Sequence, residues 1–549
     1  MGQIGVALDL GTSGFRGQAV DLENNEIIAT VLTARHPLPG ANVMDHLNFA
    51  LEAGQETAHH LVIETVNQVI SCLNVPAGSI SRLAVCGNPI QLSLFEGSEI
   101  RDLAYAGERK KKLLGIEPPN RDAKKLPAAH VAGLRLPAEV QVFIPGAVKH
   151  EIGADALAMM VQSNLLEANE IALVTDYGTN AEMALKVGER IITGSCAAGP
   201  ALEGQHIEFG MLAAPGAVHD LEAEKIGFRC LVLNDDMLSV PGDLVDLTAP
   251  AVLESAGVQA AGITGTGVIS IIYEGGKAGL IRLPGIKTPD QKLHLGWEVA
   301  FSEHDIVEAG KAIGAIRAGF ITLAAEAGIK LEDITTAYMA GASGTYVNAW
   351  KALQVGLVPP GVKKIYQIGN TSLAMARDIV VDPEKLWDLQ RLAQELRANH
   401  CMFGESRVFE RAYLLELSLW GEGMPWEQYH RFGKIYKLPE LTDPNPDPEI
   451  NRLYDRDIPD LGRWGVTYID NVGSPRRVEF AGCTGCGACI DGCPEKALSF
   501  DAEGGAVLFI RPDRCNGTAC KRCEINCPEK VFKLDLINFI PVKNISNPA

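Results

Sequence analysis

The stretch Val6-Ala7-Leu8-Asp9-Leu10-Gly11-Thr12-Ser13-Gly14 predicts the fold of the first part of this 549-residue chain. The apolar run from Ile4 to Leu10 is typical of a buried strand, and the glycine and hydroxyl residues after the aspartate predict a tight turn. Further strands are expected at Phe15 to Val20 and at Ile27 to Leu32. Together the three segments predict a short antiparallel meander.

The same design occurs a second time. The stretch Ile171-Ala172-Leu173-Val174-Thr175-Asp176-Tyr177-Gly178-Thr179-Asn180 is again an apolar run that ends in aspartate, glycine and threonine. Strand-like segments follow at Ala181 to Val187 and at Arg190 to Thr193. Two copies of Asp-x-Gly-Thr at the end of a buried strand constitute an internal repeat.

Such a pair of turns has the chemistry of a nucleotide clamp. Glycine lets phosphate oxygens approach backbone N–H groups, hydroxyl groups add donors, and the aspartates can hold Mg²⁺ directly or through its waters. Two such loops that face each other would grip the phosphates of ATP from both sides. A single Asp-x-Gly-Thr is also ordinary hairpin chemistry, so neither copy alone establishes a phosphate site. The residues expected at phosphate are Asp9, Gly11, Thr12, Ser13, Asp176, Gly178, Thr179 and Asn180.

A third segment completes the pattern. Thr335 to Ala340 is predicted as a strand that ends in Gly341-Ala342-Ser343-Gly344, whose small side chains would leave room for adenine or ribose. Upstream, Ile306 to Ala327 has apolar residues at the spacing of a helix with one buried face. Lys311 and Arg317 lie in this helix, and each is either a nucleotide contact or a solvated helix charge.

Eight of the thirteen cysteines lie within the last seventy residues, in two runs. Soft thiolate ligands at this tight spacing are typical of two [4Fe-4S] clusters, each held by three cysteines of one run and by the cysteine before proline of the other. One cluster would use Cys483, Cys486, Cys489 and Cys527, and the other would use Cys515, Cys520, Cys523 and Cys493.

Zinc ribbons and disulfides are the alternatives for these cysteines. Zinc sites usually pair two Cys-x2-Cys knuckles across a longer gap, and a secreted disulfide scaffold would not be cysteine-poor elsewhere. The second run has four residues, Asn516-Gly517-Thr518-Ala519, where two are expected. This departure leaves open whether Cys515 is a ligand.

Length and charge narrow the remaining possibilities. A chain this long is expected to form two to four domains. The net charge of −19 disfavours a nucleic-acid surface, which requires a basic stripe. No stretch approaches the roughly 20 apolar residues that span a bilayer, and the N-terminus lacks the pattern of a signal peptide. We therefore expect a cytoplasmic protein with neither a nucleic-acid nor a membrane partner.

These motifs resemble those of a known superfamily, the ATPases that include sugar kinases, heat-shock chaperones and actin. Asp9 to Ser13 and Asp176 to Asn180 resemble its two phosphate motifs, and Ala340 to Gly344 resembles its adenosine motif. The resemblance is closer to the ATP-dependent reductive activators of corrinoid proteins, and the C-terminal cysteines make the chain similar to the activases that serve methylamine methyltransferases of methanogens. The segments similar to that branch are Gly194–Gly204, Gly262–Gly267, Lys311–Gly319 and Gly341–Asn348.

The resemblance implies an α/β fold with duplicated actin-like, or ribonuclease H-like, ATPase lobes and an α+β ferredoxin-like domain. Leu386 to Trp426 has helical spacing, whereas the Pro- and Asp-rich residues 438–461 cannot sustain a helix. We expect an extended linker there that lets the ferredoxin-like domain swing. The expected regions are an ATPase and corrinoid-activation domain at 1–385 with lobes at about 1–165 and 166–385, a middle region with the linker at 386–473, a two-[4Fe-4S] domain at 474–540, and a tail at 541–549.

The implied function is ATP-dependent reduction of corrinoid (cobalamin-type) methyltransferase proteins from Co(II) to Co(I), with electrons from a low-potential donor. Asp155 is the candidate for orienting the hydrolytic water, with Glu151 in reserve, although each would equally suit a helix N-terminus. Ser195-Cys196 is a candidate cobalt-facing loop. Two alternatives remain: an ATP-gated activator of another low-potential reductase or dehydratase, and a sugar-kinase-like or chaperone-like ATPase fused to a ferredoxin.

Overall fold

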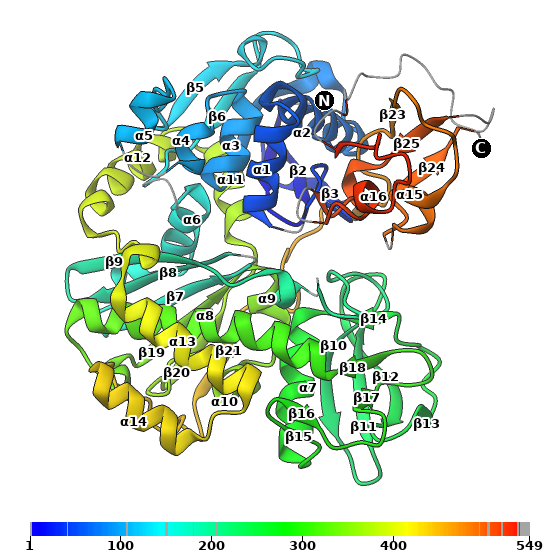
Figure 1. Cartoon of the computed structure of the whole chain (residues 1–549). Helices are drawn as coiled ribbons and strands as arrows, with labels where there is room; N and C mark the ends of the chain where they lie inside the picture. The colour runs from blue at the N-terminus through cyan, green and yellow to red at the C-terminus, as the bar shows by residue number, and fades with distance from the viewer. Residues whose placement is uncertain are drawn as a thin grey trace. The chain divides into compact units, whose positions relative to one another are not determined.

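The computed structural model describes residues 3–40, 42–105, 108–148, 152–178, 180–203, 206–493, 495–501, 506–517, 520–534 and 537. The chain forms two units (Figure 1). The first unit contains residues 1–150, 376–390 and 461–549, and the second contains 151–375 and 391–460. None of the described helices combines the length and the apolar character that a bilayer crossing demands.

The first unit is built on a seven-stranded sheet. In order across the sheet, its strands are β22 (Val466–Ile469), β3 (Ile27–Thr33), β2 (Phe15–Asp21), β1 (Ile4–Leu10), β4 (Ile80–Gly87), β6 (Gln141–Ile144) and β5 (Lys124–Pro127). The predicted meander is present, because β1, β2 and β3 pair antiparallel. On its other edge β1 pairs parallel with β4, so the strand is enclosed from both sides and all of its residues are buried.

The second unit contains a six-stranded sheet of the same design. In order, its strands are β21 (Glu449–Arg452), β20 (Lys364–Gln367), β19 (Thr336–Ala340), β7 (Ala172–Tyr177), β8 (Asn180–Val187) and β9 (Arg190–Ala197). Here β7, β8 and β9 form the meander, and β7 pairs parallel with β19. The internal repeat thus corresponds to two sheets with one topology, which confirms the predicted duplicated α/β fold.

Smaller sheets complete both units. The second unit has a five-stranded sheet of β13 (Ala251–Glu254), β12 (Ser239–Asp246), β11 (Phe228–Leu233), β10 (Ala217–Ala223) and β14 (Gly262–Ile263), and two hairpins, β15 (Ile281–Arg282) with β16 (Gly285–Ile286) and β17 (Lys292–His294) with β18 (Ala300–Ser302). The first unit has a three-stranded sheet of β23 (Arg476–Glu479), β25 (Val507–Ile510) and β24 (Leu498–Phe500). This last sheet carries the cysteine-rich region.

The described helices cover these sheets. The first unit contains α1 (Val43–Glu52), α2 (Gln55–Cys72), α3 (Pro89–Glu96), α4 (Arg101–Ala104), α5 (Glu108–Leu113), α15 (Ala488–Asp491) and α16 (Arg522–Ile525). The second contains α6 (Ala154–Gln162), α7 (Gly265–Lys277), α8 (Glu303–Ala327), α9 (Gly341–Tyr346), α10 (Ala349–Val355), α13 (Arg407–Glu422) and α14 (Trp426–Tyr436). The chain passes between the units within α11 (Thr371–Val381) and α12 (Lys385–Leu396).

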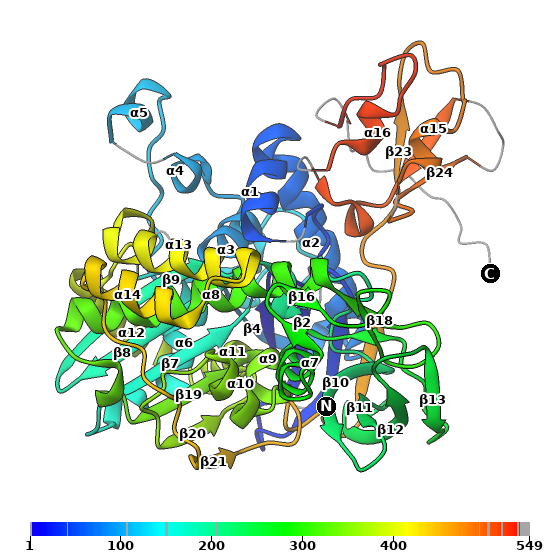
Figure 2. The ribbon, with the colours of Figure 1, turned by 60° about the horizontal axis from the view of Figure 1, so that its bottom comes forward.

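Helix α8 is the central helix of the second unit. Its N-terminus is closed by a capping box of Ser302 and Asp305, and its C-terminus ends at Gly328 in the left-handed conformation. Helix α13 lies along it (Figures 1 and 2). The two helices pack closely because a side chain at Gly310 or Gly314 would collide with α13, the added Cβ lying 2.4 Å and 2.6 Å from its nearest atoms.

The region between the ATPase motifs and the cysteines differs from the expected middle domain and free linker. Helices α13 and α14 belong to the second unit, and β21 extends its sheet parallel to β20. Strand β22 extends the sheet of the first unit parallel to β3. The Pro-rich residues 438–461 contain no α-helix, and β21 within them pairs along the edge of the six-stranded sheet. The expected tail at 541–549 lies outside the described residues.

The segment that leads into the ferredoxin-like region also differs from the expected free linker. Residues 470–475 connect β22 to β23 and span at most about 20 Å when fully extended. The backbone here is held by Gln68 of α2, which accepts from the Gly473 N–H at 3.1 Å and donates to the Asn471 carbonyl at 2.9 Å. Glu64 of the same helix forms an ion pair with Arg476, which is almost fully buried. These contacts hold the start of the ferredoxin-like region against α2, whereas a free linker was expected there, and the swinging motion itself stays a prediction.

A buried ion pair in the second unit yields a stability prediction. Arg317 of α8 donates to Glu416 of α13 at 2.9 Å, and Glu416 also accepts from Tyr429. We expect Arg317→Met to lower the free energy of unfolding by about 3–5 kcal/mol, because it leaves a buried carboxylate without its cation. Denaturant unfolding followed by tryptophan fluorescence measures this.

The matched control is Lys311→Met, which removes an exposed ion pair with Glu308 and should change stability by less than about 1 kcal/mol. The double variant Arg317→Met, Glu416→Leu should recover most of the loss, since both buried charges are then gone. A double variant as unstable as the single one would contradict this account.

Candidate functional site

The first phosphate turn joins β1 to β2 in the first unit. Asp9 stands near the end of the buried strand β1, and Arg16 lies 3.5 Å from its carboxylate. The turn is tight, since a Cβ on Gly11 would lie 2.9 Å from the Gly14 carbonyl. Gly11, Thr12 and Ser13 are partly exposed, as residues that receive a ligand must be.

Asn88 supports this turn from a neighbouring strand end. It caps helix α3, accepting from the N–H groups of Ile90 and Gln91 at 3.1 Å and 3.0 Å, and donates to the Thr12 hydroxyl at 3.2 Å. The sequence analysis did not single out this residue. The dipeptide Asn88-Pro89 is nevertheless a helix-start signal directly after an apolar strand, and it would have indicated the position.

The second phosphate turn and the adenosine segment meet in the second unit. Asp176 on β7 pairs in register with Ala340 on β19, and Gly341 follows that strand. Gly341 has φ +80°, and a Cβ there would lie 2.3 Å from the Asp176 carboxylate. The glycine is therefore required both by its backbone conformation and by the closeness of the acid.

The neighbouring predicted residues hold this segment in place. Gly178 and Asn180 flank the turn and are partly exposed, whereas Thr179 lies outside the described residues. Ala342, Ser343 and Gly344 form the short helix α9, and the Ser343 hydroxyl donates to the Leu202 carbonyl at 3.0 Å. The structure thus brings Asp176 next to Gly341 at the start of the predicted adenosine segment.

Glu182 is an acid in this region that the sequence analysis missed. It stands opposite Asp176 in the β7–β8 pair, is buried, and accepts from the Ser195 hydroxyl at 3.3 Å. Burial, reinforced by the charges of Asp155 and Asp176, raises the pKa of Glu182 well above its ordinary value. Three acids therefore share one region. In a hairpin, residues that stand directly opposite each other point to the same face of the sheet. Pairing the predicted strands on either side of the turn at 177–181 would therefore have placed Glu182 on the face of Asp176.

The remaining site candidates have mixed outcomes. Asp155 lies in the first turn of α6 and accepts from the Ala156 N–H at 2.9 Å, so it is both a helix N-terminal residue and a member of the acid group. Glu151 lies outside the described residues. Lys311 is on the solvent side of α8, where its ammonium group pairs with Glu308 at 2.5 Å. Nucleotide binding would require it to leave that pair.

Two expectations are wrong. Arg317 is neither a nucleotide contact nor a solvated charge, because it is buried against Glu416 and donates to the Val355 carbonyl at 2.5 Å. Ser195 and Cys196 are not a cobalt-facing loop. They belong to strand β9, and the Cys196 thiol is buried and directed to the Ala181 carbonyl at 3.8 Å.

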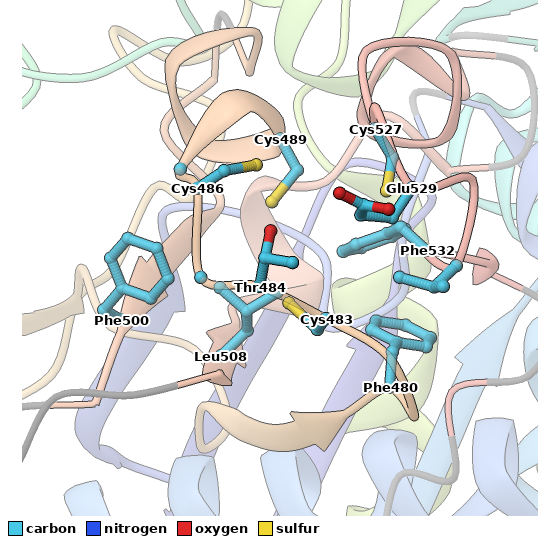
Figure 3. A pocket seen from close by; sticks show the side chains of 13 residues that line it. Phe480, Cys483, Thr484, Cys486, Cys489, Phe500, Leu508, Cys527, Glu529 and Phe532 are labelled. Carbon is cyan, nitrogen blue, oxygen red and sulfur yellow. The ribbon is translucent and has the colours of Figure 1, made fainter.

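The cysteines line two cavities. The first contains three cysteines of the first run and one of the second (Figure 3). Apolar rings of Phe480, Phe500 and Phe532 surround it. The second cavity has the reverse composition. The cysteines are Cys483, Cys486, Cys489 and Cys527 in the first cavity, and Cys515, Cys520, Cys523 and Cys493 in the second.

These cavities fit iron–sulfur clusters chemically. Each offers four thiols, and Cys515 lines its cavity despite the longer spacing that follows it, of which Thr518 and Ala519 lie outside the described residues. Burial raises the pKa of Cys515 and of Cys523 to about 12. Thiolates in such surroundings require a compensating positive charge, and the iron ions of a cluster supply it.

Comparison with known proteins agrees with this geometry. Residues 4–168 match the model of the RACo middle region, residues 170–430 that of the C-terminal ASKHA domain of RACo, and residues 482–531 that of a 4Fe-4S dicluster domain. A solved reductive activator for corrinoid, iron-sulfur protein superimposes with a TM-score of 0.63 at 24% identity, over 76% of this chain and 66% of that one. The last likeness concerns the fold alone.

Fold and motifs together define an ASKHA-type ATPase joined to a 4Fe-4S dicluster domain. The reductase of the Co(II) methylated amine-specific corrinoid protein from Methanosarcina barkeri is 47% identical over 517 residues, which is 94% of this chain and 95% of the relative. The corrinoid activation enzyme RamQ of Eubacterium limosum is 25% identical over 67% of this chain and 62% of its own length. The chain therefore belongs to the family of corrinoid protein reductases.

The crossed arrangement of cysteines yields a prediction. Replacing Cys483 and Cys527 together by serine should remove about half of the iron, because both line one cavity. Replacing Cys483 and Cys493 together should remove nearly all of it, because they line different cavities. Iron analysis of anaerobically reconstituted protein measures both. The control Cys72→Ser, outside the cysteine-rich region, should keep its full iron content. If the Cys483/Cys527 variant instead lost nearly all of its iron and the Cys483/Cys493 variant lost about half, each run would hold its own cluster.

Proposed function

We propose that this chain uses ATP to drive the one-electron reduction of a corrinoid protein from Co(II) to Co(I), in support of methylamine-dependent methyl transfer in methanogenesis. The near full-length match to a corrinoid protein reductase carries this proposal. The two cysteine cavities and the two phosphate turns provide the parts that such a reaction needs. We place the reaction in the cytoplasm.

The cysteines would hold two [4Fe-4S] clusters, which supply single electrons at low potential. Phe480, Phe500 and Phe532 surround the first cavity and would limit water near its cluster. Cys486 is exposed, which leaves one side of that cluster open to a partner. A low-potential electron donor would refill the clusters after each electron has passed to cobalt.

The phosphate turns would bind ATP. Backbone N–H groups of both turns would donate to phosphate oxygens, and Asp9 and Asp176 would hold Mg²⁺ directly or through water. Magnesium usually takes one or two carboxylates and completes its shell with phosphate and water. Asp9 and Asp176 would be the two carboxylates of such a shell. Asp155 would orient the hydrolytic water, and Gly341 to Gly344 would receive adenosine.

ATP would act by shifting a population of states. Co(I) lies at a potential below most cellular donors, and a gap of about 200 mV for one electron corresponds to about 4.7 kcal/mol. ATP binding would favour the complex in which cobalt has lost its lower axial ligand, and this loss raises the cobalt potential. Hydrolysis would then release the corrinoid protein, because the chain binds it less well without ATP.

A spectroscopic assay tests this function. Anaerobic protein is mixed with Mg-ATP, a low-potential reductant and a Co(II) corrinoid protein, and the absorbance of Co(I) is followed. We expect Co(I) only when ATP is present. Asp9→Asn and Asp176→Asn should lower the rate at least about 100-fold, because each removes a carboxylate that would hold the Mg²⁺ of ATP. The control Asp235→Asn, at an exposed position of the second unit, should retain the normal rate.

Two results would contradict the proposal. Reduction at the normal rate without ATP would show that the turns have no part in it. ADP release stimulated by a sugar, with no change at cobalt, would instead indicate a kinase.

The position of Gly341 gives a separate test of the nucleotide site. We expect Gly341→Ala to weaken ATP binding by about 10- to 100-fold, because its Cβ displaces Asp176 and its backbone is strained. The matched control is Gly276→Ala in α7, where the added Cβ has no neighbour within 4 Å. Calorimetric titration with a non-hydrolysable ATP analogue measures both variants, and equal affinities would exclude Gly341 from the site.

A further inference from the structure

The segment Thr33–Gly40 of the first unit, called the strap here, runs from the first phosphate turn to the second cysteine cavity. At its start, the Thr33 hydroxyl accepts from the Phe15 N–H at 2.8 Å and donates to the Arg35 carbonyl at 2.8 Å. At its end, the Gly40 N–H donates to the Cys515 carbonyl at 2.8 Å. Hydrogen bonds, made by the Thr33 hydroxyl at one end and by the Gly40 backbone at the other, therefore tie both ends of the strap to candidate sites.

The start of the strap lies directly against the phosphate turn. A Cβ on Gly14, the last residue of that turn, would lie 2.9 Å from both oxygen atoms of Thr33. A movement of Gly14 toward the strap would therefore press on Thr33 and strain its hydrogen bond with Phe15.

A second connection reaches the middle of the strap through α3. Asn88 donates to the Thr12 hydroxyl of the turn and caps the helix that carries Gln91. The Gln91 side-chain carbonyl lies 3.0 Å from Nε2 of His36 in the strap. Gln91 is completely buried, so its amide has no access to water as a substitute partner.

The hydrogen bonds around Gln91 form a chain in which each donor and acceptor can be assigned. The Leu38 N–H donates to Nδ1 of His36 at 3.0 Å, so this ring carries its proton on Nε2 and donates to Gln91. The Gln91 amide then donates to Nδ1 of His46 at 2.9 Å, and the two histidine rings stack at 3.8 Å. Burial lowers the pKa of His36 to about 3, so the ring remains neutral and keeps these roles.

The far end of the strap contacts the cysteine loop through two glycines. Gly40 has φ +110°, and a Cβ there would lie 2.2 Å from the Asp45 side chain. Gly517, two residues after Cys515, comes so close that its Cβ would lie 3.4 Å from the Gly40 nitrogen. The contact is therefore backbone against backbone, with no flexible side chain to absorb a displacement.

We propose that the strap couples occupancy of the first phosphate turn to the loop that carries Cys515, so that ATP binding and insertion of the second cluster strengthen each other. The inference rests on the function proposed above for both sites. A phosphate held by the turn restrains Thr12 and Gly14, and the strap then opens less often. Such a coupling is reciprocal, because each ligand changes the affinity of the other by the same factor.

Hydrogen exchange on the reconstituted full-length protein tests the coupling. Adding Mg²⁺ and a non-hydrolysable ATP analogue should slow exchange in the peptide 34–42 by at least about fivefold. In the variant Cys520→Ser, Cys523→Ser, which lacks two ligands of the second cavity, the affinity for the analogue should fall by a similar factor.

Two glutamines of the first unit, the buried Gln91 and the partly buried Gln68, provide matched variants. Gln91→Leu breaks the connection to His36 but not the direct contact at Thr33, so it should reduce the slowing at 34–42 by at least about half while the turn at 9–16 is still protected. Gln68→Leu breaks the contacts to Asn471 and Gly473 but leaves the strap intact, so it should retain the slowing.

The outcomes separate the two hypotheses. Normal binding of iron and of the analogue, with unchanged exchange at 34–42 in the wild-type chain, would overturn the coupling alone. Loss of slowing in Gln68→Leu as well as in Gln91→Leu would also overturn it, since the effect would then not pass through the strap. A chain that binds no analogue or no iron would overturn the proposed function, and the coupling with it.

Discussion

Both units depend on a strand that is paired on both sides and ends in an acid. Strands β1 and β7 each have an antiparallel neighbour on one edge and a parallel neighbour on the other, so their interior residues must be apolar. The chain can become polar only where the strand leaves the sheet. Asp9 and Asp176 stand at those ends, and the turn that follows each must be small because neighbouring backbone comes close. Fold and chemistry thus share one constraint, which is why the same short pattern specifies both.

Close backbone approach is the second recurring theme. Gly341 lies against the Asp176 carboxylate, Gly14 lies against Thr33, and Gly40 lies against the Asp45 side chain, each without space for a side chain of its own. Close packing of this kind leaves little free volume, so a displacement at one residue presses on its neighbour. Such contacts place the acids accurately within each unit and allow a local change to be felt at a neighbouring segment.

Burial distinguishes charged residues that have a structural role from those that are free to contact a ligand. Arg317 and Lys311 lie in one helix, yet Arg317 is enclosed by α13 and Lys311 is exposed. An enclosed guanidinium needs a carboxylate, and Glu416, ninety-nine positions away, supplies it. The cysteine cavities follow the same logic of distant partners, because each is completed by the residue before proline from the other run.

The sequence by itself determined the features that local patterns encode: the central strands, the turns after Asp9 and Asp176, the long helix α8, and the crossed cysteine sets, whose ligand spacing is set by the cluster. Tertiary structure alone decided the partners that lie far apart in the chain. Arg317 pairs with Glu416 and is not at the candidate nucleotide site, whereas Glu182 and Asn88 lie beside the two predicted turns. The expected linker region contains the edge strands β21 and β22. The Gly40 N–H at the end of Thr33–Gly40 donates to the Cys515 carbonyl. The physical reason is that periodicity and turn chemistry act within a few residues, whereas burial, ion pairing and sheet edges depend on what the rest of the chain brings close.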